Sequence, residues 1–381
     1  MQVIETKEQY EHIAKGQVLT IGNFDGVHIG HQELLRRARA IAKKHNTSVA
    51  AMTFWPHPAA VLHPEKAPQL LTPLPLKKRL LEENGVDCLI VVSDTYSLLN
   101  LSPKDFVDEF LMKTVRPCAV VEGVNFTFGY GRSGNVLLLR DMGKERRFEV
   151  IIVEPKESAF SKGEHGTVSS SLIRGFLEKG NVKDAAAALG RPYKLIGKTI
   201  PGRGKGSEIG FPTANIEPLE QMIPAEGVYA GFVEVGESVE DVCVSKKRLP
   251  VAISIGRAKT FLSEHPLLLE AHILATEKNK LDTDFTDYTD LKSKIQNLKS
   301  KIVSATENTE VTERNNKVNT NKNNVPNLYG KWLAMDFIAR IRPQHRFENV
   351  DALKAQIAKD CEQIKRILAT EDTEDTVENR R

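Results

Sequence analysis

The sequence predicts an α/β protein in which a doubly wound parallel sheet forms the first half and a small antiparallel β-barrel with a C-terminal helix forms the second. Up to about residue 190, short apolar runs alternate with longer helical patterns, which is typical of parallel strands covered by helices on both faces. From Leu195 onward, short strand patterns are separated by glycine-rich turns, as in small barrels. The 381 residues suffice for two domains, each with its own core.

The N-terminal half contains apolar runs that we expect to be parallel strands. The clearest connecting helices cover residues 31–45 and 103–114. The expected strands are residues 17–21, 48–54, 87–92, 118–123 and 149–154. Ligands bind at the carboxyl ends of the strands in such sheets, so the loops that follow these runs are candidate sites.

A helical segment at residues 170–190 ends the N-terminal half, and we place the domain boundary there. The predicted domains are residues 1–189 and 190–381. The strands expected in the second domain are residues 193–200, 227–235, 249–255, 267–274 and 333–341. Residues 351–369 are expected to form the terminal helix. Its packing face consists of Leu353, Ile357, Ile364 and Leu368.

A polar insertion at about residues 276–325 fits neither domain. A structureless stretch of this length inside a compact domain is usually functional or disordered. Near residues 287–303, however, apolar residues follow the spacing of one helical stripe, namely Tyr288, Leu291, Ile295, Leu298 and Ile302. We interpret this part as a short helix for self-association or partner docking, and plain disorder is the alternative.

Composition excludes several classes of function. The net charge of +3 arises from 53 basic and 50 acidic residues, so the overall charge does not call for a nucleic-acid or membrane partner. The N-terminus is polar and no apolar run approaches the ~20 residues that span a bilayer, so a cytoplasmic protein is expected. Neither a zinc knuckle nor a disulfide framework is expected, because no C-x-x-C spacing occurs. We expect reduced, buried thiols at Cys88, Cys118, Cys243 and Cys361.

Two histidines three residues apart, His28 and His31, follow the first long strand. Gly26 permits a tight turn there, and Asp25 or the turn's backbone can start a helix near His28. Both imidazoles would then share one face at the helix N-terminus, where backbone amides favour phosphate. Gly30 between them has no side chain to obstruct a polyphosphate. The alternatives are a metal half-site, for which no third ligand lies nearby, and ordinary core or surface histidines.

Four stretches resemble one enzyme family in the same order. The stretch "GNFDGVHIGH" is similar to the signature of the His-x-Gly-His nucleotidyltransferases, and specifically of the FMN adenylyltransferase half of the bifunctional riboflavin kinase/FAD synthetases of bacteria. The other three are "TFWPHP" from Thr53, "EGVNFTFGYGRSGN" from Glu122, and "VSSSLIRGFLEKGNVKDAAAALGRPY" from Val168. The resemblance implies a Rossmann-like nucleotidyltransferase domain.

The resemblance also implies roles for residues of these stretches. The FMN phosphate would attack the α-phosphorus of ATP in line, with His28 and His31 stabilising phosphate charge and Arg174 gripping the departing pyrophosphate. ATP would contact Gly22, Phe24, Gly30, His57, Ser169 and Ser170. The flavin would contact Asn125, Phe126 and Phe128. From the residues alone, simple helix capping by the serines and core packing by the two phenylalanines remain alternatives.

A second group of candidate site residues lies in the stretch "IGKTIPGRGKGSEIGFPTANI", which starts at Ile196. Gly202, Gly204 and Lys205 belong to a basic, glycine-rich loop that would let backbone amides approach an anion. The stretch resembles the nucleotide and Mg²⁺ loop of riboflavin kinases, which implies that oxygens of Thr213 and Asn215 serve the metal and the phosphates. Taken alone, the loop is compatible with nucleic-acid contact or a flexible turn, and Asn215 with a turn cap.

A glutamate interrupts the apolar strand "LLLEAHIL". In a strand of period two, Leu268, Glu270, His272 and Leu274 share one face. The resemblance to riboflavin kinases implies that Glu270 is the catalytic base, which would take the proton of the riboflavin 5′-hydroxyl as it attacks the γ-phosphate of ATP. A solvent-facing residue is the alternative. In that family a short hairpin joins this strand to the "LYGK" strand, so we expect the insertion at a hairpin tip.

The sequence therefore predicts one chain that phosphorylates riboflavin to FMN and then adenylylates FMN to FAD, with ATP as co-substrate and Mg²⁺ as cofactor. Its expected partners are small molecules, namely riboflavin, FMN, FAD and ATP. Two alternatives remain. One is an enzyme that keeps a single activity, and the other is a flavin- or nucleotide-binding interaction protein that uses the insertion.

Overall fold

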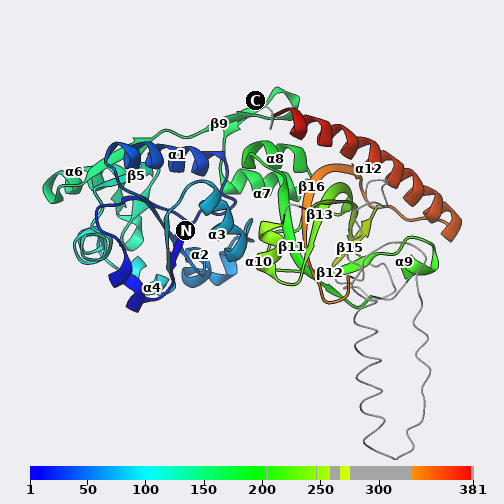
Figure 1. The fold of residues 1–381 in the computed structure, drawn as a ribbon, viewed down its shortest axis with the longest axis horizontal. Helices are drawn as coiled ribbons and strands as arrows, with labels where there is room; N and C mark the ends of the chain where they lie inside the picture. The colour runs from blue at the N-terminus through cyan, green and yellow to red at the C-terminus, as the bar shows by residue number, and fades with distance from the viewer. Residues whose placement is uncertain (203–204, 246, 258–266, 275–327, 379–381) are drawn as a thin grey trace, which may run out of the picture.

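The computed structural model describes residues 1–202, 205–245, 247–257, 267–274 and 328–378, and it consists of two units that lie side by side (Figure 1). The first unit is built on a six-stranded parallel sheet, as predicted. In their order across the sheet, the strands are β1 (Gln2–Ile4), β4 (Cys88–Val92), β3 (Val49–Phe54), β2 (Val18–Ile21), β5 (Ala119–Gly123) and β8 (Glu149–Val153). The prediction lacked only β1, whose three residues lie in a polar segment.

Helices cover both faces of this sheet, which confirms the doubly wound arrangement. Side chains of β2 alternate between a cluster that contains η3 (Phe106–Val115) and one that contains α1 (Ile29–Lys44). The other helices are η1 (Lys7–His12), α2 (Pro58–Leu62), η2 (Pro64–Lys66), α3 (Leu74–Glu83), α4 (Thr95–Leu99), α5 (Pro103–Asp105), η4 (Tyr130–Arg132), α6 (Val136–Arg146), η5 (Ser161–Gly163), α7 (Ser170–Glu178) and α8 (Val182–Leu189). Two small hairpins pair β6 (Thr127–Phe128) with β7 (Gly134–Asn135) and β9 (Glu157–Ala159) with β10 (His165–Thr167).

The strand order places a topological switch point at β2. The chain passes from β2 to β3 on one side and later returns to β5 on the other side of β2. Loops that leave the carboxyl ends of β2 and β5 therefore diverge, and such a crevice is where open α/β sheets bind ligands.

The second unit is a closed antiparallel barrel, as predicted, but it has six strands, because residues 214–218 form a strand that the sequence pattern did not indicate. In their order around the barrel, they are β11 (Tyr193–Ile200), β12 (Ala214–Pro218), β15 (Leu267–Ile273), β14 (Leu249–Arg257), β13 (Gly227–Gly236) and β16 (Trp332–Arg342). Two short helices, α9 (Lys205–Glu208) and α10 (Val239–Val244), lie between strands.

The terminal helix α12 (Val350–Glu378) packs on the outside of the barrel with three of the four residues of the predicted face, Ile357, Ile364 and Leu368, whereas Leu353 is half-buried and does not belong to the apolar cluster formed there. Ile364 and Leu368 are buried there beside Leu274, and Arg342 of β16 forms a 2.8 Å ion pair with Asp360. All four cysteines are free thiols; Cys88 and Cys361 are buried, but Cys118 and Cys243 are only half-buried, so the expectation of four buried thiols is only partly confirmed.

The barrel corrects two points of the sequence analysis, the expected hairpin after β15 and the alternative of a turn cap at Asn215. β15 pairs with β12 and β14, whereas β16 pairs with β11 and β13, so β15 and β16 are not neighbours and the expected hairpin between them is wrong. The alternative of an Asn215 turn cap is also wrong, because Asn215 lies within β12. The insertion at 276–325, with its expected helix at 287–303, lies outside the described residues.

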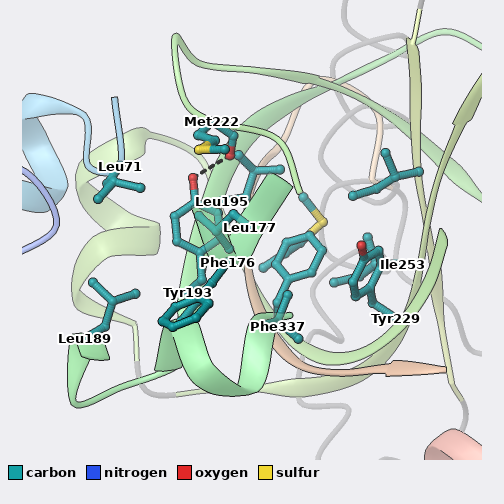
Figure 2. Packing of buried hydrophobic residues seen from close by; sticks show 14 of the residues in the cluster. Leu71, Phe176, Leu177, Leu189, Tyr193, Leu195, Met222, Tyr229, Ile253 and Phe337 are labelled. Carbon is teal, nitrogen blue, oxygen red and sulfur yellow. Dashed lines mark hydrogen bonds between the residues drawn. The ribbon is translucent and has the colours of Figure 1, made fainter. Parts of the chain in front are cut away.

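One apolar core joins the two units. Figure 2 shows Leu71 of the first unit beside Tyr193, Leu195 and Met222 of the barrel. The same cluster contains Phe176 and Leu189 from α7 and α8, and it continues into the barrel interior at Tyr229, Ile253 and Phe337 (Figure 2). Across the described ranges, we find no helix with the length and apolarity needed to cross a bilayer.

Candidate functional sites

The first site surrounds the loop that follows β2 at the switch point. Gly26 has φ of +87° and permits the sharp turn into α1, while Phe24 is buried with φ of +46°. His28 is the N-cap of α1, so the expectation that Asp25 or the turn starts the helix is wrong in detail. The buried Asp25 carboxylate has other partners.

His28 and His31 point to the same place, as their spacing predicts. Their rings are stacked with centroids 3.7 Å apart, and Phe24 packs edge-on against His31. His28 Nδ1 accepts a long hydrogen bond of 3.4 Å from the His31 backbone N–H, which leaves its proton on Nε2. A side chain at Gly30 would lie 3.1 Å from the His28 ring, so only glycine fits without displacing that ring.

Burial keeps both imidazoles neutral. Desolvation, followed by the charge of Arg191, lowers the pKa of His28 to about 4. Desolvation also lowers the pKa of His31 well below 6.5, and the nearby His28 and Lys77 act in the same direction. His31 Nδ1 is buried without a hydrogen-bond partner. The two rings are therefore available to a ligand as neutral hydrogen-bonding groups, not as resident cations.

Arg174 reaches this site from α7 and forms an ion pair with Asp25. The Asp25 carboxylate also accepts hydrogen bonds of 2.9 and 3.0 Å from the backbone N–H groups of Leu71 and Thr72. Arg174 Nε donates to the Gln69 carbonyl at 2.7 Å. Asp25 thus holds Arg174 and residues 69–72 together, a role that the sequence pattern did not indicate.

The two serines also lie at this site. The Ser169 hydroxyl is the N-cap of α7 and accepts from Leu172 N–H, whereas Ser170 donates to the Asp25 carbonyl at 2.8 Å. Capping therefore accounts for Ser169 in this structure, and Ser170 ties α7 to the loop after β2. Gly22 begins that loop, where an added side chain would contact the Phe24 ring.

His57 and Lys77 lie beside His28 and His31. His57 Nε2 is 3.1 Å from Asn23 Nδ2, and Lys77 Nζ donates to the Asn23 carbonyl at 2.8 Å. Lys77 is only 2% exposed, and its Nζ lies 5.7 Å from the centre of the Trp55 ring. Burial lowers the pKa of Lys77 to about 8. Sequence reasoning missed Lys77 because it is one of several lysines in an amphipathic helical pattern.

The predicted flavin loop leaves β5, the strand adjacent to β2. Asn125 is exposed and Phe126 is half-buried, whereas Phe128 is 6% exposed and packs in the core against Phe106. Phe126 and Phe128 stack with centroids 5.8 Å apart. Asn125 and Phe126 thus have accessible surface, and Phe128 supports the loop from behind.

The second site lies on the outer face of the barrel. Glu270 of β15 is directly opposite Asn215 of β12 and Ser254 of β14, so the three side chains share one face. Leu269 and Ala271 point into the barrel core, which confirms the predicted alternation. Burial raises the pKa of Glu270 above 4.5. Next to it, His272 Nδ1 lies 2.7 Å from the Pro212 carbonyl, a contact that the sequence did not indicate.

The glycine-rich loop passes close to the same residues. A side chain at Gly202 would lie 1.8 Å from Asn215 Nδ2, and one at Gly206 would lie 2.7 Å from Thr213 Oγ1. These two positions must be glycine for the loop to approach Thr213 and Asn215. Gly204 and the side chain of Lys205 lie outside the described residues.

The donor groups of the two sites differ in the metal that they could hold. In the part of the chain that the structure describes, no cluster of three or more His, Cys, Asp and Glu residues could hold an ion, so the metal half-site at His28 and His31 gains no third ligand. Thr213 and Asn215 supply neutral hard oxygens beside the Glu270 carboxylate. This donor set fits Mg²⁺, which is usually held by few protein oxygens together with phosphates and water.

Comparisons with known proteins match both halves of the chain. The family "FAD synthetase" matches residues 10–171, and the family "Riboflavin kinase" matches residues 189–300 and 288–368. A bifunctional riboflavin kinase/FMN adenylyltransferase of Escherichia coli is 32% identical over 346 residues, which is 91% of each chain. The Bacillus subtilis protein of the same name is 31% identical over 92% of each chain.

A solved structure also matches nearly the whole chain. It is titled a macrolide-efflux protein from Streptococcus pneumoniae, is 26% identical, and superposes with a TM-score of 0.71 over 96% of this chain and 99% of its own. The arrangement of parallel sheet, barrel and terminal helix therefore recurs in an experimental structure.

Proposed function

Because the chain belongs to the bifunctional riboflavin kinase/FMN adenylyltransferase family, it phosphorylates riboflavin to FMN and adenylylates FMN to FAD, and we propose here which residues carry out each reaction. Both reactions use ATP. Two observations support the assignment: His28 and His31 stack on each other at the switch point of the sheet, and Glu270 lies opposite Asn215 on the outer face of the barrel.

For adenylylation, an FMN phosphate oxygen attacks the α-phosphorus of ATP, and the bond to the β-phosphate oxygen breaks. His28 and His31 donate hydrogen bonds to the phosphates at the N-terminus of α1, where backbone N–H groups add further donors. The buried cation of Lys77 lies beside them and stabilises the added charge of the transition state. Arg174 binds the departing pyrophosphate, while Gly22, Phe24, Gly30, His57, Ser169 and Ser170 shape the ATP site.

The flavin ring of FMN binds at the loop after β5. Asn125 hydrogen-bonds to the ring and Phe126 stacks on it, while Phe128 keeps Phe126 in place. Since β5 is adjacent to β2, a flavin there lies next to the phosphates at His28 and His31.

For the kinase reaction, the riboflavin 5′-hydroxyl attacks the γ-phosphorus of ATP and Glu270 accepts the hydroxyl proton. Its raised pKa makes Glu270 a stronger base than an exposed carboxylate. Gly202, Gly204 and Lys205 approach the phosphates. Thr213 and Asn215 would hold Mg²⁺, which would neutralise phosphate charge.

The experiment that tests these assignments feeds each reaction separately. With Mg²⁺ and ATP present, His31→Ala should abolish FAD formation from FMN and spare FMN formation from riboflavin, and Glu270→Ala should do the reverse. Separation of the flavins by chromatography reads both. Loss of both activities in either variant would contradict the separate sites, and accumulation of FMN without FAD in the unaltered protein would support the single-activity alternative.

Three further expectations are also proposals: the domain boundary, the location in the cell, and self-association or partner docking. The domain boundary is kept between residues 189 and 190, where Gly190 ends α8 with φ of +70°. The free thiols support a cytoplasmic location. Self-association or partner docking through residues 287–303 is tested by gel filtration of the protein in which the insertion is replaced.

A further inference from the structure

The barrel contacts the loop that holds the adenylylation residues in place. We infer that Gln221, a residue of the kinase barrel, positions Arg174 and Asp25 of the FMN adenylyltransferase site through residues 69–72. This inference rests on the proposed role of Arg174 and adds a residue from the other half of the chain to the same site.

Gln221 is a buried amide whose hydrogen bonds connect the two units. It is 5% exposed, and its Oε1 accepts from the Ile196 backbone N–H at 2.9 Å. Its Nε2 donates to the carbonyls of Lys194 at 3.0 Å and Leu71 at 3.1 Å. The bonds to Ile196 and Lys194 stay within the barrel, so the bond to Leu71 is the one that reaches the first unit.

The next residue strengthens this connection. Met222 N–H donates to the Leu70 carbonyl at 2.8 Å, and the Met222 carbonyl accepts from the Tyr193 hydroxyl, as Figure 2 shows. The Leu71 side chain is 1% exposed and packs against the same barrel residues. Residues 70 and 71 are therefore held by the barrel through both backbone and side chain.

Those residues in turn determine where the proposed catalytic groups lie. The Leu71 and Thr72 N–H groups donate to the Asp25 carboxylate, and the Gln69 carbonyl accepts from Arg174. The ion pair between Asp25 and Arg174 closes this network, so that residues 69–72, Asp25 and Arg174 are all bonded to one another. A shift of residues 69–72 would move both partners of Arg174 together, and sub-ångström placement of a phosphate-binding group matters for such transfers.

A cavity at the same junction supports the assignment. It has a volume of about 440 Å³ and is lined from the first unit by residues that include His57 and Gln69, and from the barrel by Glu220 and Gln221. Gln221 therefore forms part of a wall that faces a proposed ATP-binding residue. Arg191, the second residue after the proposed boundary, likewise donates to the Gly26 carbonyl at 2.8 Å.

The test is a double-mutant cycle in the full-length protein. Gln221→Leu keeps the approximate volume of the side chain but loses its hydrogen bonds to Leu71, Lys194 and Ile196, of which only the bond to Leu71 reaches the first unit. It should lower kcat for FAD formation from FMN about tenfold, with the KM for FMN and the kinase kcat within about twofold. In an Arg174→Met background the same change should cost less than about threefold, because Gln221 acts through Arg174. An equal loss in both backgrounds, or no loss in the first, would overturn the inference.

Two further variants separate positioning from general destabilisation. Gln221→Glu can donate to the Leu71 carbonyl only when protonated, so it should recover more of the wild-type FAD-forming rate at pH 6 than at pH 8.5, and an unchanged deficit would count against the inference. Gln17→Leu removes another buried amide at the opposite end of β2, where Gln17 bonds Ser48, and should leave the rate within about twofold. Arg174→Met alone tests the proposed role of Arg174: if it leaves FAD formation unchanged, that role fails independently of Gln221.

Discussion

At the scale of single residues, His28 makes the stability of the fold depend on pH. Its pKa is about 4 in the folded protein, against 6.5 for an ordinary histidine, because burial disfavours the charged ring. Between these values the unfolded chain binds the proton and the folded chain does not. The contribution of His28 to the free energy of unfolding should therefore be complete above pH 6.5. As the pH is lowered toward 4, the free energy of unfolding should fall by about 3 kcal/mol.

Urea unfolding at a series of pH values measures this dependence. His28→Asn is the matched variant, because asparagine can also cap α1 but does not titrate. Its unfolding free energy should vary less between pH 7.5 and pH 4.5 than that of the unaltered protein. An identical pH dependence in the two proteins would show that His28 does not contribute.

Lys77 yields a second prediction at this scale. Since its buried ammonium group lies next to His31 and His57, replacement by methionine removes the cation but keeps the chain length. Lys77→Met should lower the rate of FAD formation from FMN at least tenfold, a loss of the size seen when one transition-state donor is removed, and leave the kinase rate unchanged. Lys78→Met is the matched control, because Lys78 instead pairs with Glu5 at 2.6 Å. Equal rates for the two variants would contradict the role of Lys77.

At the scale of elements, the sequence predicted what depends on local periodicity. The alternation in residues 267–274 gave the face of Glu270, and the spacing of His28 and His31 gave their common direction. β12 was missed because proline, threonine and asparagine are typical of turns, and only its pairing with β11 and β15 makes it a strand. The ion pair of Asp25 with Arg174 joins residues 149 positions apart, which no local pattern reports.

The connection from β15 to β16 yields the prediction for the insertion. Its two described ends lie in the barrel, where Leu274 N–H bonds the Pro250 carbonyl and the Thr199 hydroxyl bonds the Leu328 carbonyl. A replacement must cross the barrel end, and about eight residues suffice at ~3.3 Å each for three strand spacings of ~4.8 Å. With residues 276–325 replaced by eight Gly and Ser residues, FAD formation from FMN should remain unchanged.

The kinase activity and the size of the same variant discriminate between the roles of the insertion. β15 carries Glu270 and ends beside Pro212 and Thr213, so any catalytic contribution must appear in FMN formation from riboflavin. A changed elution volume with normal FMN formation would make the insertion an association element. A loss of FAD formation from FMN would contradict the prediction, since it would require contact with the first unit.

At the scale of the whole molecule, the two units share one apolar core in addition to the hydrogen bonds that Arg191, Gln221 and Met222 form between them. Leu71, Phe176 and Leu189 belong to the same buried cluster as Tyr229, Ile253 and Phe337 of the barrel interior (Figure 2). Domains joined by a large apolar interface are expected to unfold together, whereas those joined by a small polar one unfold separately. The change in sequence pattern near residue 190 predicted two domains, but it could not reveal this interface because the residues of the interface come from distant segments.

Joint unfolding can be measured with the two tryptophans of the chain, Trp55 in the first unit and Trp332 in the barrel. Trp332→Phe leaves Trp55 as the fluorescent reporter, and Trp55→Phe leaves Trp332, and the two urea midpoints should coincide. Ile253→Ala in the barrel interior removes buried apolar volume and should cost about 2–5 kcal/mol. If the shared core couples the units, that substitution shifts the midpoint reported by Trp55 as much as the midpoint reported by Trp332. A Trp55 midpoint that stays in place while the barrel unfolds earlier would show that the interface is too weak to couple them, and it would also weaken the case for positioning of Arg174 by Gln221.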